Sequence, residues 1–431
     1  MKNLTIKSSS NTIYVFDGIT NDINQIDSIE LVQLATDETN IIRSFMPSSL
    51  DDLKSRITTQ AKTLMLEITE QCNLRCTYCV YDESYSSNRD HGFSSISEDT
   101  AKNAIDNFIL RAGGSDAYIV FYGGEPLLEF EMIKELTEYA KNIAQNKIHF
   151  SLTTNATQLT NEKIDFLIMN DFLITISIDG NQAIHDKYRL TSNGHGTFEK
   201  IMNNIGSIKT KNKTFFHEKI NINCVINKID DISDLNQFFD NESFNLQNIR
   251  FSHQIQKNSE LNTQIVQKFT KEHVLSLIRN EKFKKSPVEY QYFSPTIRKI
   301  IYRDIKEESY QASPKCTPFS NRTFVRTNGK VQFCERIENV GISESDPKIL
   351  VETARLFQQQ YYEFVKNDCE NCFAFNFCEM CYASFVQNNK LDLQTFKNKC
   401  ETFRNDVKLS LEIYIELMEN DEEELLESEC C

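Results

Sequence analysis

Between residues 60 and 255, short apolar runs alternate with longer stretches in which apolar residues repeat at helical spacing. Six runs rich in β-branched and aromatic residues predict strands at 63–68, 117–122, 148–153, 172–178, 220–225 and 249–252. Strands that alternate with helices form a parallel sheet with crossover helices. Six strands are too few for a closed eight-stranded barrel, so we expect an α/β fold with an open, partial (β/α)6 barrel.

The intervening stretches carry their own helix signals. Ser97 can cap a helix that Gly113 and Gly114 end. The same apolar spacing predicts another helix over 198–208. The apolar face of the first helix contains Ala101, Ala104, Ile105, Phe108 and Ala112.

The regions on either side of this segment differ in pattern. Alternation at 13–16 and 29–34 predicts a small β element near the start of the chain. Polar residues at 257–264 separate the barrel from two amphipathic stretches. The predicted divisions are a small N-terminal β-containing region (1–60), the partial barrel (61–255), a helical linker (256–311), a cysteine-rich domain (312–415) and an acidic C-terminal tail (416–431), whose end we expect to be frayed.

The cysteine-rich domain opens with a hairpin signal. Segments 323–326 and 330–333 flank Asn328 and Gly329, a pair that favours a two-residue turn. Further on, apolar residues at helical spacing predict a long helix. Its packed side contains Phe403, Val407, Leu411, Tyr414 and Met418.

Composition and charge narrow the class of protein. Hydrophobic residues make up 40% of the 431 positions, with only 12 Gly and 7 Pro, as in an ordinary folded soluble protein. The net charge of −15 opposes binding to nucleic acid, and no apolar segment is long enough to span a bilayer. We therefore expect a cytoplasmic protein with no nucleic-acid or membrane partner. In that reducing compartment, 13 cysteines indicate metal ligation before disulfides.

Cys72, Cys76 and Cys79 lie within eight residues of one another, directly after the first predicted strand. Three thiolates can bind three irons of a cubane [4Fe–4S] cluster and leave the fourth iron open to an external ligand. A zinc site is the alternative, but structural zinc takes four ligands and no fourth Cys or His is nearby in the sequence.

The stretch from Cys72 to Cys79 resembles the CxxxCxxC signature of radical SAM enzymes, including the aromatic Tyr78 before the last cysteine. The resemblance implies that the open iron binds S-adenosylmethionine (SAM). It also implies that one electron from the cluster cleaves SAM to a 5′-deoxyadenosyl radical.

Other motifs resemble the SAM contacts of the same family. Gly123, Gly124, Glu125 and Pro126 match its GGEP motif, whose glutamate and backbone receive the SAM ammonium group. The third and fourth predicted strands are followed by hydroxyl, amide and guanidinium groups, which suit a ribose and a carboxylate. An apolar residue on a later strand stands where relatives pack the adenine. These residues are Thr154, Asn155, Ser177, Asp179, Arg189 and Val225.

The C-terminal cysteines resemble the SPASM domain, which carries two auxiliary [4Fe–4S] clusters. By that resemblance, the first auxiliary cluster takes Cys316, Cys334 and Cys381, and the second takes Cys369, Cys372, Cys378 and Cys400. The chain departs from the usual pattern in having two residues, not three, between Cys378 and Cys381. Zinc ribbons with an architectural role are the alternative for this array.

The cysteine inventory leaves the first auxiliary cluster one ligand short. Relatives often have a further cysteine shortly before the position of Cys316, but no cysteine lies between Cys224 and Cys316. Either this cluster keeps an open iron, or the substrate or a tail cysteine completes it. Cys430 and Cys431 could be ligands, a redox pair or part of a disordered end.

The resemblance implies a radical SAM/SPASM oxidoreductase that acts on a peptide or protein. We expect a maturase of a ribosomally made precursor peptide with a leader, one that forms a side-chain cross-link such as a thioether. A flavodoxin or ferredoxin would supply electrons, and residues 1–60 could bind the leader by strand addition.

An anaerobic sulfatase-maturing, formylglycine-forming enzyme is the alternative. Tyr81 and Glu335 stand where such relatives place a tyrosine and a proton acceptor. A zinc-organised interaction protein is the non-enzymatic alternative.

Overall fold

The computed structural model describes residues 2–26, 47–79, 81, 91–114, 116–144, 147–241, 244–253, 269–302, 316–337, 342, 346–378, 380–387 and 390–430. The predicted alternation at 29–34 and the polar stretch at 257–264 lie outside these residues.

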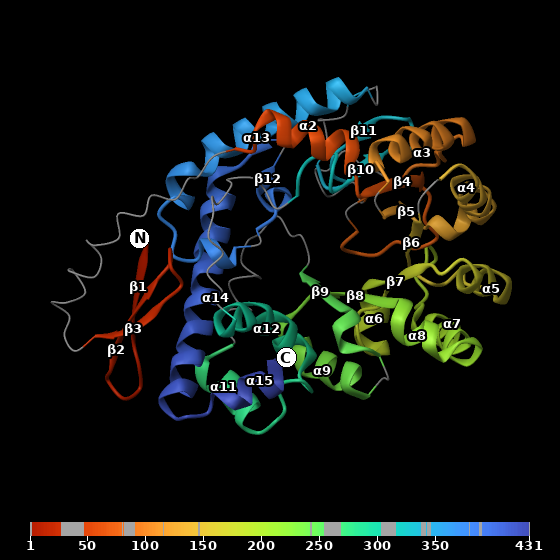
Figure 1. Ribbon diagram of the computed structural model, residues 1–431. Coiled ribbons are helices and arrows are strands. Elements are labelled where there is room, and N and C mark those ends of the chain that lie inside the picture. The colour runs from red at the N-terminus through yellow and green to blue at the C-terminus, as the bar shows by residue number, and fades with distance from the viewer. Residues whose placement is uncertain are drawn as a thin grey trace.

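A curved sheet forms the centre of the molecule, with helices along its outer side (Figure 1). All six predicted strands are present and parallel, and each differs from its predicted bounds by at most a few residues. They are β4 (Thr63–Thr69), β5 (Ala117–Gly123), β6 (Ile148–Thr154), β7 (Leu173–Ser177), β8 (Ile220–Ile226) and β9 (Ile249–His253). Their order in the sheet follows the sequence, so the predicted open barrel is confirmed.

Helices join successive strands in the manner expected of a parallel sheet. The first is capped as predicted: the Ser97 hydroxyl accepts a hydrogen bond from the Thr100 amide, and Gly113 ends the helix at φ +60°. The helices of this part of the chain are α2 (Leu50–Thr59), α3 (Glu98–Ala112), α4 (Phe130–Ile143), α5 (Asn161–Met169), α6 (Gln182–Tyr188), α7 (Phe198–Lys211), α8 (Lys213–Lys219) and α9 (Ile232–Asn241), with the short 3-10 turns η1 (Pro126–Glu129), η2 (Ile229–Asp231) and η3 (Leu246–Asn248).

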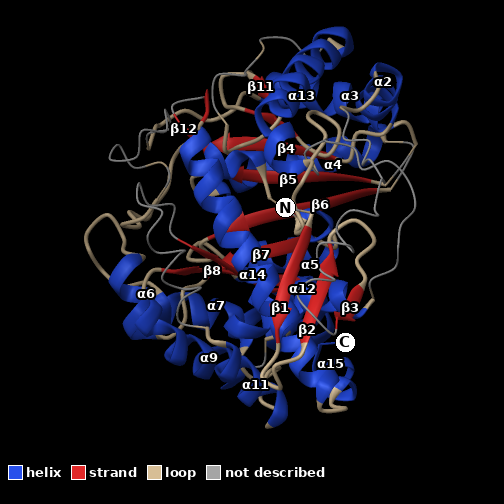
Figure 2. Ribbon diagram, turned by 90° about the vertical axis from the view of Figure 1, so that its left-hand side faces the viewer, coloured by secondary structure: helices blue, strands red, loops and turns tan. Residues whose placement is uncertain are grey.

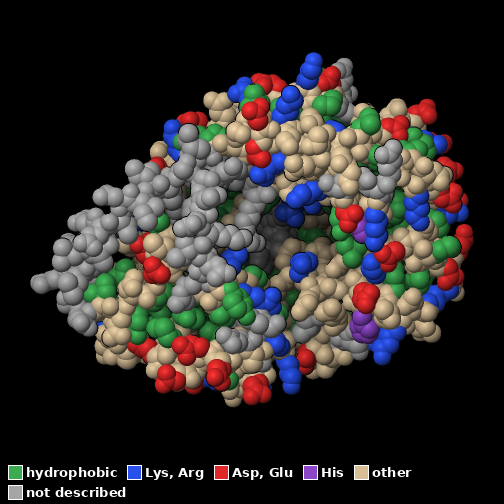
Figure 3. Space-filling view, viewed as in Figure 1, with side chains coloured by type: hydrophobic (Ala, Val, Ile, Leu, Met, Phe, Trp, Pro, Cys, Tyr) green, Lys and Arg blue, Asp and Glu red, His purple; other side chains and the backbone are tan. Residues whose placement is uncertain are grey.

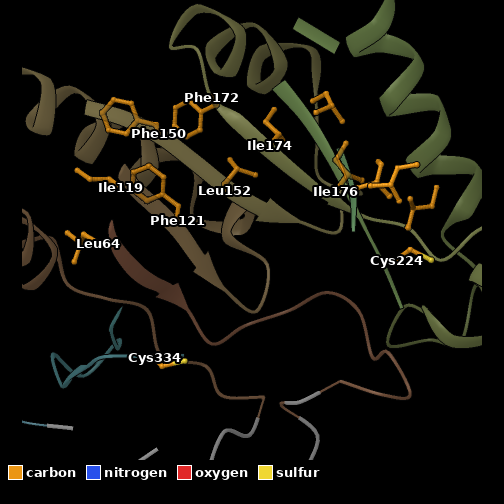
Figure 4. Packing of buried hydrophobic residues seen from close by; sticks show 14 of the residues in the cluster. Leu64, Ile119, Phe121, Phe150, Leu152, Phe172, Ile174, Ile176, Cys224 and Cys334 are labelled. Carbon is orange, nitrogen blue, oxygen red and sulfur yellow. The ribbon is translucent and has the colours of Figure 1, made fainter. Parts of the chain in front are cut away.

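The two faces of the sheet differ in polarity because side chains alternate along each strand. The outer face is apolar and buried under the helices, where Phe121, Phe150 and Phe172 stack with ring centroids 5.5–6.4 Å apart (Figure 4). Some of the alternate positions, among them Thr153 and Asn223, are polar and only half-buried. The space-filling view shows a hollow in the middle of the molecule with Lys and Arg side chains at its rim (Figure 3).

A hairpin from the cysteine-rich region extends this sheet. Strand β10 (Thr323–Val325) pairs in parallel with β4, and β11 (Val331–Gln332) pairs with β10 in antiparallel orientation. The hairpin is confirmed, but its two-residue turn is wrong. The Arg326 amide bonds to the Lys330 carbonyl at 2.9 Å, which leaves three residues in the loop. Gly329, at φ +79°, takes the left-handed position that such a loop requires.

Further helices follow in the C-terminal half of the chain. Figure 2 shows α14 crossing in front of the sheet, with the N-terminal strands beside it. The helices are α11 (Lys271–Arg279), α12 (Pro287–Ile301), α13 (Pro347–Cys369), α14 (Leu393–Glu419) and α15 (Glu423–Cys430); the remaining short elements are η4 (Phe375–Phe377), η5 (Tyr382–Phe385), β12 (Val386–Gln387) and β13 (Lys390–Leu391).

Both described ends of the chain pack against α14. The strands β1 (Asn3–Lys7), β2 (Ile13–Asp17) and β3 (Ile23–Ile26) form a sheet whose apolar side meets α14, with Phe16 and Leu411 in the same buried cluster. The frayed tail predicted from its acidic composition is wrong. Residues 423–430 form α15, which contacts α11, α12 and α14 and buries Leu426 completely.

Candidate functional site

The first cysteine triplet lies on a loop at the carboxyl end of β4. Backbone pairing with a segment after α6 holds this loop: the Arg75 amide bonds to the Leu190 carbonyl at 2.7 Å, and the Thr77 amide to the Tyr188 carbonyl at 3.0 Å. Within the loop, the Cys79 amide bonds to the Cys76 carbonyl at 3.0 Å. The loop therefore has a defined backbone that holds the three thiols at one edge of the sheet.

The environment of the triplet suits a cationic cluster. Burial, together with the charges of Glu125, Cys76 and Cys79, raises the pKa of Cys72 to about 12. These thiols therefore need a nearby cation to ionise. Within the described part of the chain, no three His, Cys, Asp or Glu side chains converge closely enough to hold a single ion. A cubane cluster does not need three side chains on a single ion, because each of its irons takes one thiolate.

The glycines of the Gly-Gly-Glu-Pro turn let it pack against the start of the cysteine loop. The Gly124 amide bonds to the Thr69 carbonyl and the Glu125 amide to the Gln71 carbonyl, both at 2.8 Å. A Cβ on Gly123 would lie 2.1 Å from the Thr69 carbonyl oxygen, and one on Gly124 would lie 2.2 Å from that of Gln71. Gly123 also has φ +136°. Only glycine fits at these two positions without moving the loop.

The Glu125 carboxylate is fully buried and bound within the protein. Its Oε1 accepts hydrogen bonds from the Leu127 amide at 3.0 Å and the Thr154 hydroxyl at 2.7 Å, and its Oε2 accepts one from the Asn155 amide at 2.7 Å. Burial raises the pKa of Glu125, and these bonds oppose that rise. Glu125 thus joins the turn after β5 to the end of β6, while Pro126 begins η1. A SAM ammonium contact by Glu125 stays a prediction.

Asp179, also fully buried, is the centre of a second network. It accepts two hydrogen bonds from Arg189, at 3.0 and 3.2 Å, and one from the Val225 amide at 2.9 Å. The Tyr78 hydroxyl donates to it as well. Behind it, the Asp179 amide donates to His185 Nδ1 at 3.2 Å. The cysteine loop, the segment after α6 and strand β8 therefore each supply a residue that binds the Asp179 carboxylate.

The structure brings the predicted SAM contacts to one edge of the sheet, at the carboxyl ends of β5 to β8. The amide Nδ2 of Asn155 lies 3.9 Å from the Cys72 sulfur, which connects the Glu125 network to the triplet. Ser177 ends β7 and is buried. This is the edge that carries active sites in barrel-like parallel sheets.

The first predicted auxiliary set is brought together beside the β10–β11 hairpin. Burial and the charge of Cys381 both raise the pKa of Cys316 and of Cys334, and the pKa of Cys334 reaches about 12. The fully buried Tyr382 lies beside all three cysteines of this set. A cation is thus required here as well if the three thiols are to act as thiolates.

The second predicted set is also brought together, between the end of α13 and the start of α14. Burial raises the pKa of Cys369 and of Cys400, and in both cases the charges of Cys378 and Cys372 raise it further. The Arg404 guanidinium lies 3.4 Å from the Cys372 sulfur.

The two predicted catalytic residues have different surroundings. Glu335 lies 2.5 Å from Arg322 and 3.6 Å from the Cys334 sulfur. Burial acts to raise the pKa of Glu335, but the Arg322 guanidinium outweighs it and holds the pKa below its usual range. Tyr81 is buried beside His91, with ring centroids 6.3 Å apart.

Sequence reasoning missed the basic residues that accompany these groups. Arg322 is one of them; the hairpin register, once known, places it opposite Cys334. Arg326 is another: it lies 3.3 Å from the buried Glu67 on β4 and 3.7 Å from Glu70. A hairpin pattern gives no sign of which strand it will join, so neither pairing could be read from the sequence.

Three comparisons with known proteins bear on these sites. Residues 66–238 match the model of the Radical SAM superfamily. A cysteine-type anaerobic sulfatase-maturating enzyme of Clostridium novyi is 33% identical over 171 residues, which is 38% of this chain and 43% of that protein. One of Clostridium perfringens is 28% identical over 333 residues, covering 72% of this chain and 85% of that protein.

The radical SAM cyclopropyl synthase TigE of Paramaledivibacter caminithermalis is 26% identical over 162 residues, covering 36% of this chain and 34% of that protein. Among solved structures, native anSMEcpe with bound AdoMet and Cp18Cys peptide aligns with a TM-score of 0.63 and 20% identity over 84% of this chain and 99% of that one. At this identity the likeness shows the fold. No helix in the described residues has the length and apolar character needed to cross a membrane.

Proposed function

Because residues 66–238 form a radical SAM domain, which makes this chain a radical SAM enzyme, we propose that it oxidises a side chain of a ribosomally made precursor peptide. We assign the first cluster and SAM to the edge of the sheet that carries the cysteine triplet. When bound, they supply the 5′-deoxyadenosyl radical that removes a hydrogen atom from the substrate.

The residues around the triplet would place SAM. Glu125 and the turn that contains it would face the amino group, and the ends of β6, β7 and β8 would face the ribose and adenine. Asn155, which reaches Cys72, is well placed to contact both the cluster and its ligand. The half-buried polar lining of the sheet leaves room for a peptide next to the bound SAM.

We assign an auxiliary [4Fe–4S] cluster to each C-terminal cysteine set, within a SPASM domain at 312–415. Oxidation that forms a new bond releases a second electron and a proton, which the radical step does not take up. The auxiliary clusters would accept the electron, and Glu335, beside Cys334, is the candidate for the proton. Tyr81 would assist from the cysteine loop. A flavodoxin or ferredoxin would return the first electron.

One observation carries the choice of a cross-linked peptide: the first auxiliary set has three cysteines, Cys316, Cys334 and Cys381. The tail does not readily supply the fourth, because the Lys284 ammonium binds the Ser428 carbonyl and α15 packs on α11 and α12. Three ligands leave one iron open, and an open iron binds a thiolate. A substrate cysteine bound there would be positioned to form a thioether.

The N-terminal sheet offers a place for the leader of such a peptide. Among the described strands its order is β1-β2-β3, so β1 and β3 are its edges, and an edge strand presents backbone groups with which another strand can pair. An extended leader could add to either edge through main-chain hydrogen bonds.

Formylglycine formation is the second candidate. It is favoured by the length of the match to the Clostridium perfringens sulfatase-maturating enzyme, which covers 85% of that protein. That reaction oxidises the side chain of a Ser or Cys to an aldehyde; with Cys, water then replaces the sulfur, which leaves as sulfide. It therefore needs no thiolate on an auxiliary iron.

Anaerobic incubation with SAM and a reductant tests both candidates. A precursor peptide encoded beside the gene and a sulfatase peptide with a Cys or Ser target would be supplied in parallel. We expect 5′-deoxyadenosine and a peptide mass lower by two hydrogen atoms with the precursor alone. Conversion of the sulfatase peptide alone would favour the second candidate, and no deoxyadenosine with either peptide would contradict the proposal.

A further inference from the structure

Arg189 and Cys76 face each other across a short backbone pairing. The residues on either side of Cys76 bond to the residues on either side of Arg189: Arg75 to Leu190, and Thr77 to Tyr188. The pairing therefore fixes position 189 opposite the middle cysteine of the triplet. The Arg189 guanidinium reaches the Cys76 thiol: burial raises the pKa of that thiol, and the charge of Arg189 and a hydrogen bond from it oppose the rise.

Two further donors of Arg189 bind Asp179. Its Nε and one Nη bind the two oxygens of Asp179 at 3.0 and 3.2 Å, and its guanidinium carbon lies 5.3 Å from the centre of the Tyr78 ring. Only 6% of Arg189 is exposed. A guanidinium has five N–H donors in a fixed fork, and these contacts with Asp179 and Cys76 occupy three of them, so two donors remain for other partners.

Asp179 is held in turn from its other side. The Val225 amide binds its Oδ1, and its own amide binds His185 Nδ1, which makes Nε2 the protonated ring nitrogen facing Thr197 at 3.0 Å. Thr197 donates to the Arg189 carbonyl at 2.9 Å. This closed ring of hydrogen bonds orients the Arg189–Asp179 ion pair, with the Arg189 guanidinium toward Cys76.

We propose that Arg189, oriented by Asp179, is a positioning residue that sets the reduction potential of the cluster that Cys76 helps to bind. The inference rests on the proposed function, because it requires that cluster. A positive charge and an N–H···S bond beside a ligand sulfur stabilise the reduced cluster, which carries one more negative charge. The buried carboxylate of Asp179 offsets part of that effect, and burial protects the pair from screening by salt.

The two members of the pair should therefore shift the potential in opposite directions. Arg189→Gln removes the positive charge and lowers the midpoint potential, while Arg189→Lys keeps the charge and lowers it less. Asp179→Asn leaves the guanidinium uncompensated and raises the midpoint potential. Arg56→Gln is a matched control, because it removes one positive charge from an exposed pair with Asp52 on α2.

The measurement is a redox titration of the reconstituted full chain followed by EPR, with the SAM-responsive signal identifying the cluster. Equal potentials in wild type, Arg189→Gln and Asp179→Asn would overturn the inference, as would a loss of SAM affinity in Arg189→Gln without a shift in potential. Loss of the cluster from Arg189→Lys would assign the pair a structural role and also overturn it. A wild-type chain with no SAM-responsive signal would instead contradict the proposed function, so the two failures are distinct.

Discussion

The guanidinium of Arg326 lies 3.3 Å from the carboxylate of Glu67, so that two residues 259 positions apart in the sequence form an ion pair inside the sheet. Glu67 is fully buried on β4, and its Oε1 has no hydrogen-bond partner among the described residues. The Thr327 amide binds the other oxygen at 3.3 Å. Arg326 therefore supplies the only charge shown to balance this carboxylate in the described structure.

Removing that charge should be costly. Arg326→Met leaves a buried carboxylate without its cation, and we expect a loss of about 3–5 kcal/mol in the free energy of unfolding, measured by urea denaturation. The double variant Glu67→Gln with Arg326→Met should regain much of the loss, because no buried charge remains. If the double variant were no more stable than Arg326→Met, the pairing would not be the cause.

The glycine turn gives a second prediction. Gly124→Ala places a methyl group 2.2 Å from the Gln71 carbonyl oxygen, so the cysteine loop must shift. We expect the iron content of anaerobically reconstituted protein to fall by about four atoms per chain, the content of one cubane. Gly206→Ala, in α7, is the matched control: nothing lies within 4 Å of its added carbon, and a helix gains about 1 kcal/mol from the change. Unchanged iron in Gly124→Ala would show that the loop tolerates the shift.

The cysteine sets predict separate losses of iron. We expect about twelve irons per reconstituted chain and about eight in Cys76→Ala or Cys400→Ala, because each change disrupts one cubane. Cys224→Ala should keep the full content, since this buried cysteine on β8 belongs to none of the three sets. Zinc in place of iron in the wild-type protein would support the non-enzymatic alternative.

Stability should depend on pH through Asp406. Burial raises the pKa of Asp406 to about 7, although a hydrogen bond from Tyr292 opposes the rise. The folded state then holds a proton that the unfolded state releases near pH 4. The favourable contribution is present at low pH and is lost as the pH rises toward 7, by roughly 4 kcal/mol at most.

Asp406→Asn removes this titration but keeps an acceptor for Tyr292. The variant should match wild type in apo-protein stability at about pH 4 and exceed it at pH 8, as measured by urea denaturation at each pH. An equal difference at both pH values would contradict the assigned pKa.

The barrel could be predicted because its signals are local. Runs of β-branched and aromatic residues, such as those around Phe121, Phe150 and Ile174, mark the strands within the sequence itself, so the strand bounds follow to within a few residues. The cysteine sets were predictable for a related reason: their spacing is a sequence property. The SAM contacts at the strand ends follow once the sheet is known to be parallel.

The rest depends on contacts between distant segments. Nothing near Thr323 indicates that β10 will pair with Leu64 on β4. The tail was predicted to fray because it is acidic, but Leu426 and an Arg279–Glu422 ion pair attach it to α11 and the core. Arg189 was predicted to bind SAM from its position in a motif, and its pairing with Asp179 and Cys76 became visible only in three dimensions.

The packing of the N-terminal sheet on α14 imposes an order on biosynthesis. Ser8 bonds to Glu419, 411 positions later, and the described residues that cover the apolar side of β2 include Ile300, Phe377 and residues of α14. At a translation rate of about 5–20 residues per second, that side would wait roughly 20–80 s for α14. Strands β1 to β3 are thus synthesised long before these partners, and a chaperone would have most to protect in this part of the nascent chain.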